Sequence, residues 1–177
     1  MITTSMSSEE RIWKAINLKE PDRIPCYIDV GFQTARAGGI TLRELMFEPF
    51  IAYETGKKVY ESYGSGFDVW DNYSNTGTIY LAPIPNSHTS MIFNWKLPGV
   101  DLPEDSLPQM VETPIMEKVE DYKTLIEKGI WHYSKKLSPQ LNKLYTKCLS
   151  EGFKVATESE KWFKERGLPT SLVGSLI

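Results

Sequence analysis

The fold is decided by residues 41–73, TLRELMFEPFIAYETGKKVYESYGSGFDVWDNY. Thr41 and Glu44 have the spacing of a capping box, in which each side chain bonds the backbone N–H of the other residue. Pro49 suits the first turn of a second helix, where a missing N–H costs nothing. Apolar residues then recur at three- and four-residue steps up to Gly64, so the stretch predicts two helices and a stop.

The same stretch ends in an apolar run that predicts a buried strand over 67–73. In parallel α/β folds, binding and catalytic groups lie mostly at the carboxyl ends of strands. Four polar residues within or just after this run are therefore the first candidates for a functional site. They are Asp68, Asp71, Asn72 and Asn75.

The composition indicates an ordinary soluble α/β protein of 177 residues, 41% hydrophobic and 24% charged. Its 20 Lys and Arg against 23 Asp and Glu give a formal net charge of −3, which offers no basic face for nucleic acid. The first residues lack the pattern of a secretory signal, and no run is long enough to span a bilayer. Cys26 and Cys148 make no disulfide framework, so we expect both in the core of a cytoplasmic protein.

The amino-terminal segment predicts a helix, a strand and a loop. Ser7 and Glu10 form a second capping box in front of a short amphipathic helix that ends before Pro21. The sequence EPDRIP then leads into an apolar strand over 26–30. Residues 31–39, GFQTARAGG, are rich in glycine and predict an irregular loop at the carboxyl end of that strand.

The segment over 76–116 changes character. Residues 78–82 and 91–95 predict the two strands of a hairpin, and six of the eleven prolines fall between Pro83 and Pro114. Because proline is excluded from helix interiors and central strands, we interpret this segment as an insertion over one end of the domain. Long ordered loops of this kind form lids or substrate walls in many enzymes, and a purely structural role fits the pattern equally well.

Helices resume in the carboxyl-terminal part of the chain. Residues 119–126 present one apolar helical face, and Gly129 ends that helix. A second helix with an apolar stripe over 139–149 is expected to be interrupted at Gly152, and the helical pattern then continues over 155–163.

The last residues, LPTSLVGSLI over 168–177, predict a buried strand. Four of its aliphatic side chains, Leu172, Val173, Leu176 and Ile177, would together contribute about 6–12 kcal/mol on burial, comparable with the net stability of a whole domain. We therefore favour an interrupted fold in which this strand needs further partners. The alternative is a compact two-layer domain in which the strand pairs internally.

Three pieces of the chain together resemble the amino-terminal part of the uroporphyrinogen decarboxylase superfamily. They are SSEERIWKAINLKEPDRIPCYID over 7–29, TLRELMFEPFIAYETGKKVYESYG over 41–64 and FDVWDNYSN over 67–75. The superfamily includes the decarboxylase itself and cobalamin-dependent methyltransferases that work with corrinoid proteins. The resemblance covers residues 7–75, and the later hairpin and terminal strand follow the same order more loosely.

The resemblance implies a (β/α)8 TIM-type barrel, an α/β fold that typically needs about 250 residues. We therefore expect residues 1–177 to form the amino-terminal part of one incomplete barrel domain, with amino-terminal helices and a β-hairpin insertion. Residues 1–75 would hold the first strand, helices and a second strand-like run. Residues 76–116 would form the hairpin and proline-rich insertion, and 117–177 the later helices and the terminal strand.

Departures from the family pattern argue against uroporphyrinogen as the substrate. The decarboxylase has an arginine-rich RQAGR loop after its first strand, whereas the corresponding loop here offers Arg36 alone. The family aspartate that faces the pyrrole nitrogens corresponds to Asn75, and an amide cannot supply its negative charge. The methyltransferase branch lacks both features. Its zinc-binding His and Cys residues lie later in the barrel, so the resemblance assigns no metal ligand to this chain.

The candidate site residues are Asp71 and Asn75 as catalytic groups and Arg36 and Tyr73 as substrate contacts. A guanidinium fork suits carboxylate or phosphate, which favours an anion contact for Arg36. Each residue also has a structural alternative, because strand-end carboxylates anchor loops, loop arginines are solvated and strand aromatics pack. Neither histidine has a partner at metal-ligand spacing, so no metal site is predicted here.

The resemblance implies the amino-terminal segment of a corrinoid (cobalamin)-dependent methyltransferase that acts on a small methylated substrate or thiol acceptor, and we expect this chain to be inactive alone. For a complete barrel the resemblance implies zinc and a corrinoid partner protein. One alternative is a decarboxylase-like enzyme for a tetrapyrrole or other carboxylated ligand. Another is a non-catalytic chain that completes a barrel, through residues 168–177, with a second polypeptide or a second copy of itself.

Overall fold

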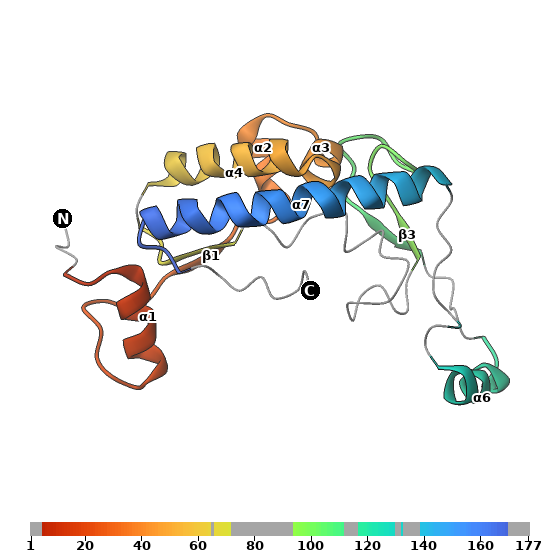
Figure 1. The fold of residues 1–177 in the computed structure, drawn as a ribbon, viewed down its shortest axis with the longest axis horizontal. Helices are drawn as coiled ribbons and strands as arrows, with labels where there is room; N and C mark the ends of the chain where they lie inside the picture. The colour runs from red at the N-terminus through yellow and green to blue at the C-terminus, as the bar shows by residue number, and fades with distance from the viewer. Residues whose placement is uncertain are drawn as a thin grey trace.

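The computed structural model describes residues 5–64, 66–71, 94–111, 117–129, 132 and 139–169. In these residues the chain is a mixed α/β protein dominated by helices. The helices α4 (Pro49–Tyr63) and α7 (Pro139–Glu165) lie side by side along the molecule (Figure 1). Helix α1 (Ser8–Ile16) lies at one end and α6 (Val119–Lys128) at the other.

The first two strands form a small parallel sheet. Strand β1 (Tyr27–Asp29) pairs with β2 (Val69–Asp71). In this register Tyr27 lies opposite Val69 and Asp29 lies opposite Asp71. Two strands predicted from the sequence, in the parallel arrangement of an α/β fold, are thus confirmed, although each is only three residues long.

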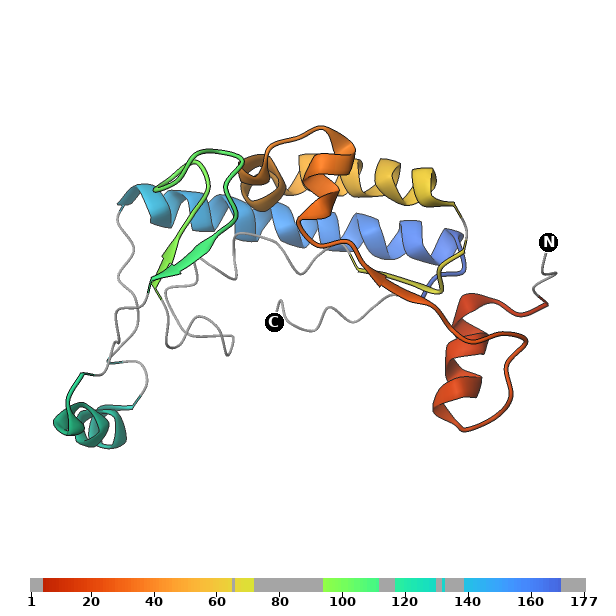
Figure 2. The ribbon, with the colours of Figure 1, turned by 180° about the vertical axis from the view of Figure 1, so that it is seen from behind.

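The two long helices cover one face of the parallel sheet, as Figure 2 shows from behind. Ile28 of β1 packs toward them, whereas the preceding Tyr27 is 57% exposed. Each buried aliphatic or aromatic side chain at this contact contributes about 1.5–3 kcal/mol. The buried residues of this core cluster are Val30, Val59, Tyr60, Phe163 and Leu168.

The irregular loop predicted over 31–39 is wrong, because most of it forms helix α2 (Gln33–Gly38). The helix packs against α4, and a Cβ added to Gly38 would lie 1.9 Å from Cγ2 of Thr55. Gly38 is therefore needed for the close packing of α2 against α4. Gly39 then ends α2 in the left-handed conformation, with φ of 69°, which glycine adopts without steric cost.

Both predicted capping boxes are confirmed. At the start of α3 (Leu42–Phe47), the backbone N–H of Glu44 donates to Thr41 Oγ1 at 3.1 Å and the Thr41 N–H donates to Glu44 Oε2 at 2.9 Å. Ser7 and Glu10 make the same reciprocal pair at the start of α1. These bonds satisfy N–H groups that have no partner inside the helix.

A second small sheet lies in the proline-rich part of the chain. Strand β3 (Asn94–Lys96) pairs antiparallel with β4 (Gln109–Val111). Strand β4 was not predicted, because it lies in the proline-rich part of the sequence. The expected partner strand over 78–82 lies outside the described residues. Prolines flank the paired residues instead of interrupting them, which keeps the ladder N–H groups available. They are Pro98, Pro103 and Pro108.

Helix α7 runs without a break for 27 residues, so the predicted interruption at Gly152 is wrong. A glycine inside a helix costs about 0.5–1 kcal/mol, which burial of Cys148, Val155 and Phe163 on the same helix outweighs. Leu168, the first residue of the predicted terminal strand, is buried in the core, and residues 170–177 lie outside the described part.

The predicted helix before Gly129 is confirmed as α6. Its apolar face is open to solvent in this structure, since Val119 and Ile126 are more than 80% exposed. Among the described helices, none combines the length and the apolar character needed to cross a bilayer.

Candidate functional site

The carboxyl edge of the parallel sheet brings two aspartates next to each other. Asp29 is the last residue of β1, Asp71 is the last residue of β2, and the two are register partners. Neighbouring strands lie about 4.8 Å apart, so the two Cα atoms are at side-by-side positions on the sheet edge. The sequence had singled out Asp71 and passed over Asp29. The signal was the same for both, an aspartate at the end of a short apolar run.

Arg36 lies on α2, which begins four residues after Asp29, and its side chain is exposed. It is therefore presented by a helix and not by the loop that the sequence suggested. The other two predicted site residues, Tyr73 and Asn75, lie outside the described residues. The structure thus brings together two strand-end positions and leaves Arg36 on the helix that follows the first strand.

Asp68, one of the four polar residues that the sequence singled out, was expected inside a strand over 67–73, but it lies directly before β2, at the amino end of that strand. Its side chain is fully buried, and its carboxylate accepts five hydrogen bonds. Arg23 donates from both Nη atoms, at 2.6 and 2.9 Å, and Ser8 Oγ donates at 2.9 Å. Arg11 Nη1 and the backbone N–H of Cys26 complete the set.

Arg11 links this carboxylate to a second one. Its Nε donates to Asp22 Oδ1 at 2.5 Å and its Nη2 donates to Asp22 Oδ2 at 3.0 Å, while Nη1 reaches Asp68. Asp22 also accepts from the backbone N–H groups of Ser5 and Met6. We call Arg11, Asp22, Arg23 and Asp68 the ion cluster; it joins the amino-terminal segment to the start of the sheet.

The bonds in the ion cluster hold both acids in the charged form. Burial alone raises the pKa of Asp68, but the donors on Cys26, Arg23, Ser8 and Arg11 outweigh it and leave that pKa below its usual value. The hydrogen bonds from Arg11 are the main reason that the pKa of Asp22 is lowered. Neither acid is thus adapted to exchange protons near neutral pH.

The arrangement of the ion cluster is that of a structural clamp. All buried side-chain nitrogen and oxygen atoms in the described part of the chain have hydrogen-bond partners, including those of Arg11 and Asp68. It also lies at the amino ends of the two parallel strands, at the edge of the sheet opposite to Asp29 and Asp71. Sequence reasoning missed Arg11 and Arg23, although both lie within the piece 7–29 that carries the family resemblance.

The described residues include no cluster of possible metal ligands, and their two cysteines differ in exposure. No group of three or more His, Cys, Asp or Glu there could hold a metal ion, so no zinc-dependent step is derived from this chain. Cys148 is buried as predicted, donates its thiol proton to the Phe47 carbonyl at 3.5 Å, and has a pKa raised by burial to about 11. Cys26 is exposed, so its prediction as a core residue is wrong.

The chain was compared with models of known protein families, with curated proteins and with solved structures, and none of them matches. The fold itself, in the described residues, is that of a mixed α/β protein with a short parallel sheet under two long helices. The resemblance to the uroporphyrinogen decarboxylase superfamily stays a prediction from the sequence.

Proposed function

We propose that this chain supplies the amino-terminal part of a TIM-type barrel of the uroporphyrinogen decarboxylase superfamily, of the corrinoid-dependent methyltransferase type, and that it is inactive by itself. The observation that carries the proposal is the pairing of Asp29 with Asp71 at the carboxyl ends of two parallel strands. Enzymes built on parallel strands place substrate and catalytic groups at this edge.

The arrangement around the sheet supports the same proposal. The chain runs from a strand through helices to a second, parallel strand, which is the repeating unit of a barrel. Helices α4 and α7 cover one face of the sheet, and Tyr27 on the other side of β1 is largely exposed. In a barrel, one face of each strand meets the outer helices and the other meets the interior.

Arg36 and the sheet edge would bind the substrate. A guanidinium on α2, the helix that leaves the carboxyl end of β1, suits a carboxylate or another small anion. The proposed substrates are small methylated compounds or thiol acceptors, with Asp71, Tyr73 and Asn75 lining the mouth of the barrel. Zinc and the corrinoid would be held by groups other than those described here.

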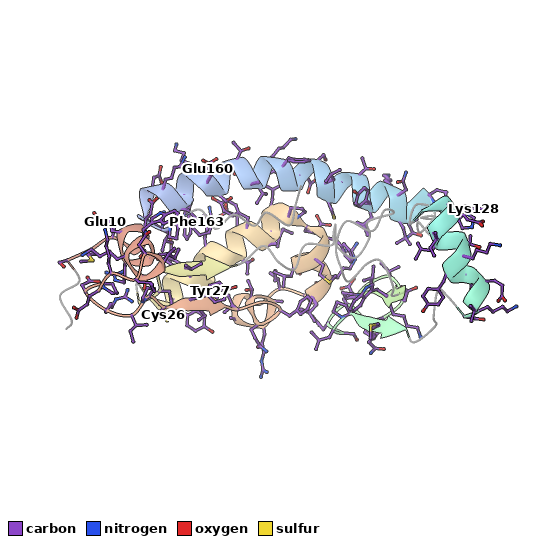
Figure 3. All side chains as sticks on the ribbon, turned by 90° about the horizontal axis from the view of Figure 1, so that it is seen from below. Glu10, Cys26, Tyr27, Lys128, Glu160 and Phe163 are labelled. Carbon is purple, nitrogen blue, oxygen red and sulfur yellow. The ribbon has the colours of Figure 1, made fainter. Side chains whose placement is uncertain are left out.

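The test is ligand-observed NMR of the chain with 3-mercaptopropionate, a thiol that carries a carboxylate, and with 1-propanethiol, which lacks one. Binding of the first and a weaker response to the second are expected. Arg36→Ala should lower the affinity for 3-mercaptopropionate about tenfold, as expected for loss of one charged hydrogen-bonding partner. Lys128→Ala, which removes a cation at the far end of the molecule (Figure 3), should leave it unchanged.

Equal binding of the two thiols, or equal effects of the two variants, would contradict this assignment of Arg36.

Anaerobic incubation with methylcobalamin and 3-mercaptopropionate should leave the methylcobalamin absorbance unchanged, because the proposed site is incomplete. Conversion of uroporphyrinogen by the chain would favour the decarboxylase alternative instead. Light scattering addresses the partner-chain alternative: a monomer that binds no hydrophobic dye would count against it.

A further inference from the structure

The start of the parallel sheet is held by a group of bonds between residue 26 and residues 68 and 69. The N–H groups of Asp68 and Val69 both donate to the carbonyl oxygen of Cys26, at 2.8 and 3.2 Å. The Cys26 N–H donates in return to Asp68 Oδ2 at 2.8 Å. Both backbone groups of Cys26, its N–H and its C=O, are therefore hydrogen-bonded to residues 68 and 69.

The register of such a short strand pair needs outside support. Each strand has three paired residues, and a slip of two residues would keep every side chain on its own face. A slip would carry the Cys26 N–H about 6.6 Å away from the Asp68 carboxylate, beyond hydrogen-bonding distance. The bond between Cys26 and Asp68 therefore forms in the observed register and fails in the slipped one.

The Asp68 carboxylate is not free to follow a sliding strand. Arg11 and Arg23 hold its oxygens from the amino-terminal segment, and Ser8 adds a third side chain from α1. Charge-assisted bonds of this kind are the strongest hydrogen bonds in proteins, and the forked contact from Arg23 also fixes direction. The carboxylate thus acts as a fixed point against which residue 26 is aligned.

We propose that Asp68 is a positioning residue: it fixes β1 against β2 in the register that places Asp29 beside Asp71 at the opposite edge of the sheet. The amino-terminal segment takes part through Arg11 and Arg23, because it holds the carboxylate in place. The inference rests on the proposed function only for the role of Asp29 and Asp71 in binding.

Disulfide trapping measures the register without any ligand. In a background of Cys26→Ser and Cys148→Ala, one reporter carries Asp29→Cys with Asp71→Cys and the other carries Asp29→Cys with Val69→Cys. In the observed register the first pair has Cα atoms about 4.8 Å apart, within the range of a disulfide, and the second about 8 Å apart, outside it. With oxidised glutathione as oxidant, the first reporter should form its disulfide at least about tenfold faster.

Asp68→Asn in both reporters should reduce that ratio about tenfold, toward equal rates, because a carboxylate acceptor of several charged bonds is lost. Val59→Ala removes core packing under α4 without touching the ion cluster and should leave the ratio unchanged. Glu160→Gln breaks an exposed ion pair on the outer side of α7 and should also leave it unchanged (Figure 3).

An unchanged ratio in Asp68→Asn, or the same fall in Val59→Ala, would overturn the proposal and leave a plain stability role. If Asp68→Asn does not fold, Arg23→Met decides in the same way, since it removes two donors to Asp68 from a partly exposed position. The assay contains no thiol ligand or corrinoid, so its outcome is independent of whether the proposed substrates bind.

Discussion

Cys26 and Asp68 are joined in both directions: the Cys26 N–H donates to the Asp68 carboxylate and the Asp68 N–H donates to the Cys26 carbonyl, each at 2.8 Å. This ring closes the amino end of the parallel sheet. The same carboxylate also anchors the amino-terminal segment through two arginines. One buried charge thus ties residues between 8 and 26 to residue 68, more than 40 positions further along the chain.

Removal of that charge should destabilise the protein strongly. Asp68→Asn leaves Arg11 buried without one of its two acids, and breaking one side of a buried ion pair typically costs about 3–5 kcal/mol. Urea unfolding followed by circular dichroism at pH 7 measures the loss. Glu160→Gln, in an exposed pair, should change the free energy of unfolding by less than about 0.5 kcal/mol. Equal unfolding midpoints for the two variants would contradict the role assigned to the cluster.

The same acid should make stability depend on pH below neutrality. The pKa of Asp68 is lowered in the folded state, so its stabilising contribution is complete above the unfolded pKa of about 3.9 and disappears as pH falls through the folded-state value. The free energy of unfolding should therefore fall from about pH 5 downward, as the unfolded state takes up protons first. In Asp68→Asn this fall should be shallower; an identical pH profile in both proteins would count against the assignment.

The core between β1 and the long helices should depend on Phe163. This residue is 4% exposed, and Phe163→Ala should cost about 3–5 kcal/mol through lost burial and a cavity. Phe153 lies on the same helix and is 57% exposed, so Phe153→Ala is a matched control and should cost less than about 1 kcal/mol. Thermal unfolding of the two variants separates them, and similar losses would show that the described packing of α7 is wrong.

Two glycines in helices should respond to alanine in opposite directions. Gly38→Ala places a methyl group 1.9 Å from Cγ2 of Thr55 and should destabilise the protein by about 1–3 kcal/mol. Gly152→Ala meets no atom within 4 Å and should stabilise the protein by about 0.5–1 kcal/mol, because alanine is the better helix former. Unfolding midpoints that move the same way in both variants would contradict the close contact of α2 with α4.

The two cysteines should differ in reactivity. Cys26 is exposed, whereas burial raises the pKa of Cys148 from about 9 to about 11, which lowers its thiolate fraction about 100-fold near pH 8. Iodoacetamide at pH 8 should therefore label Cys26 first, as peptide mass spectrometry would show. In denaturant both should react at similar rates, which is the control. Rapid labelling of Cys148 in the folded protein would place it outside the core.

The sequence alone determined the local elements of this protein. Capping boxes at Ser7 and Thr41, proline at the start of α4 and apolar spacing over 119–126 each predicted a helix that the structure contains. The two apolar runs before Asp29 and Asp71 likewise predicted the parallel strands. These features depend on bonds and contacts within a few residues, so they can be recognised without knowledge of the fold.

Tertiary structure decided what distant residues do to one another. Most of the glycine-rich segment 31–39 is a helix because α4 packs against it, and α7 passes through Gly152 because buried residues on either side hold it. The pairing of Asp29 with Asp71, and the burial of Asp68 between two arginines, join residues more than 40 positions apart. No local pattern encodes such contacts, since their free energy comes from burial and charge pairing that exist only once the chain has folded.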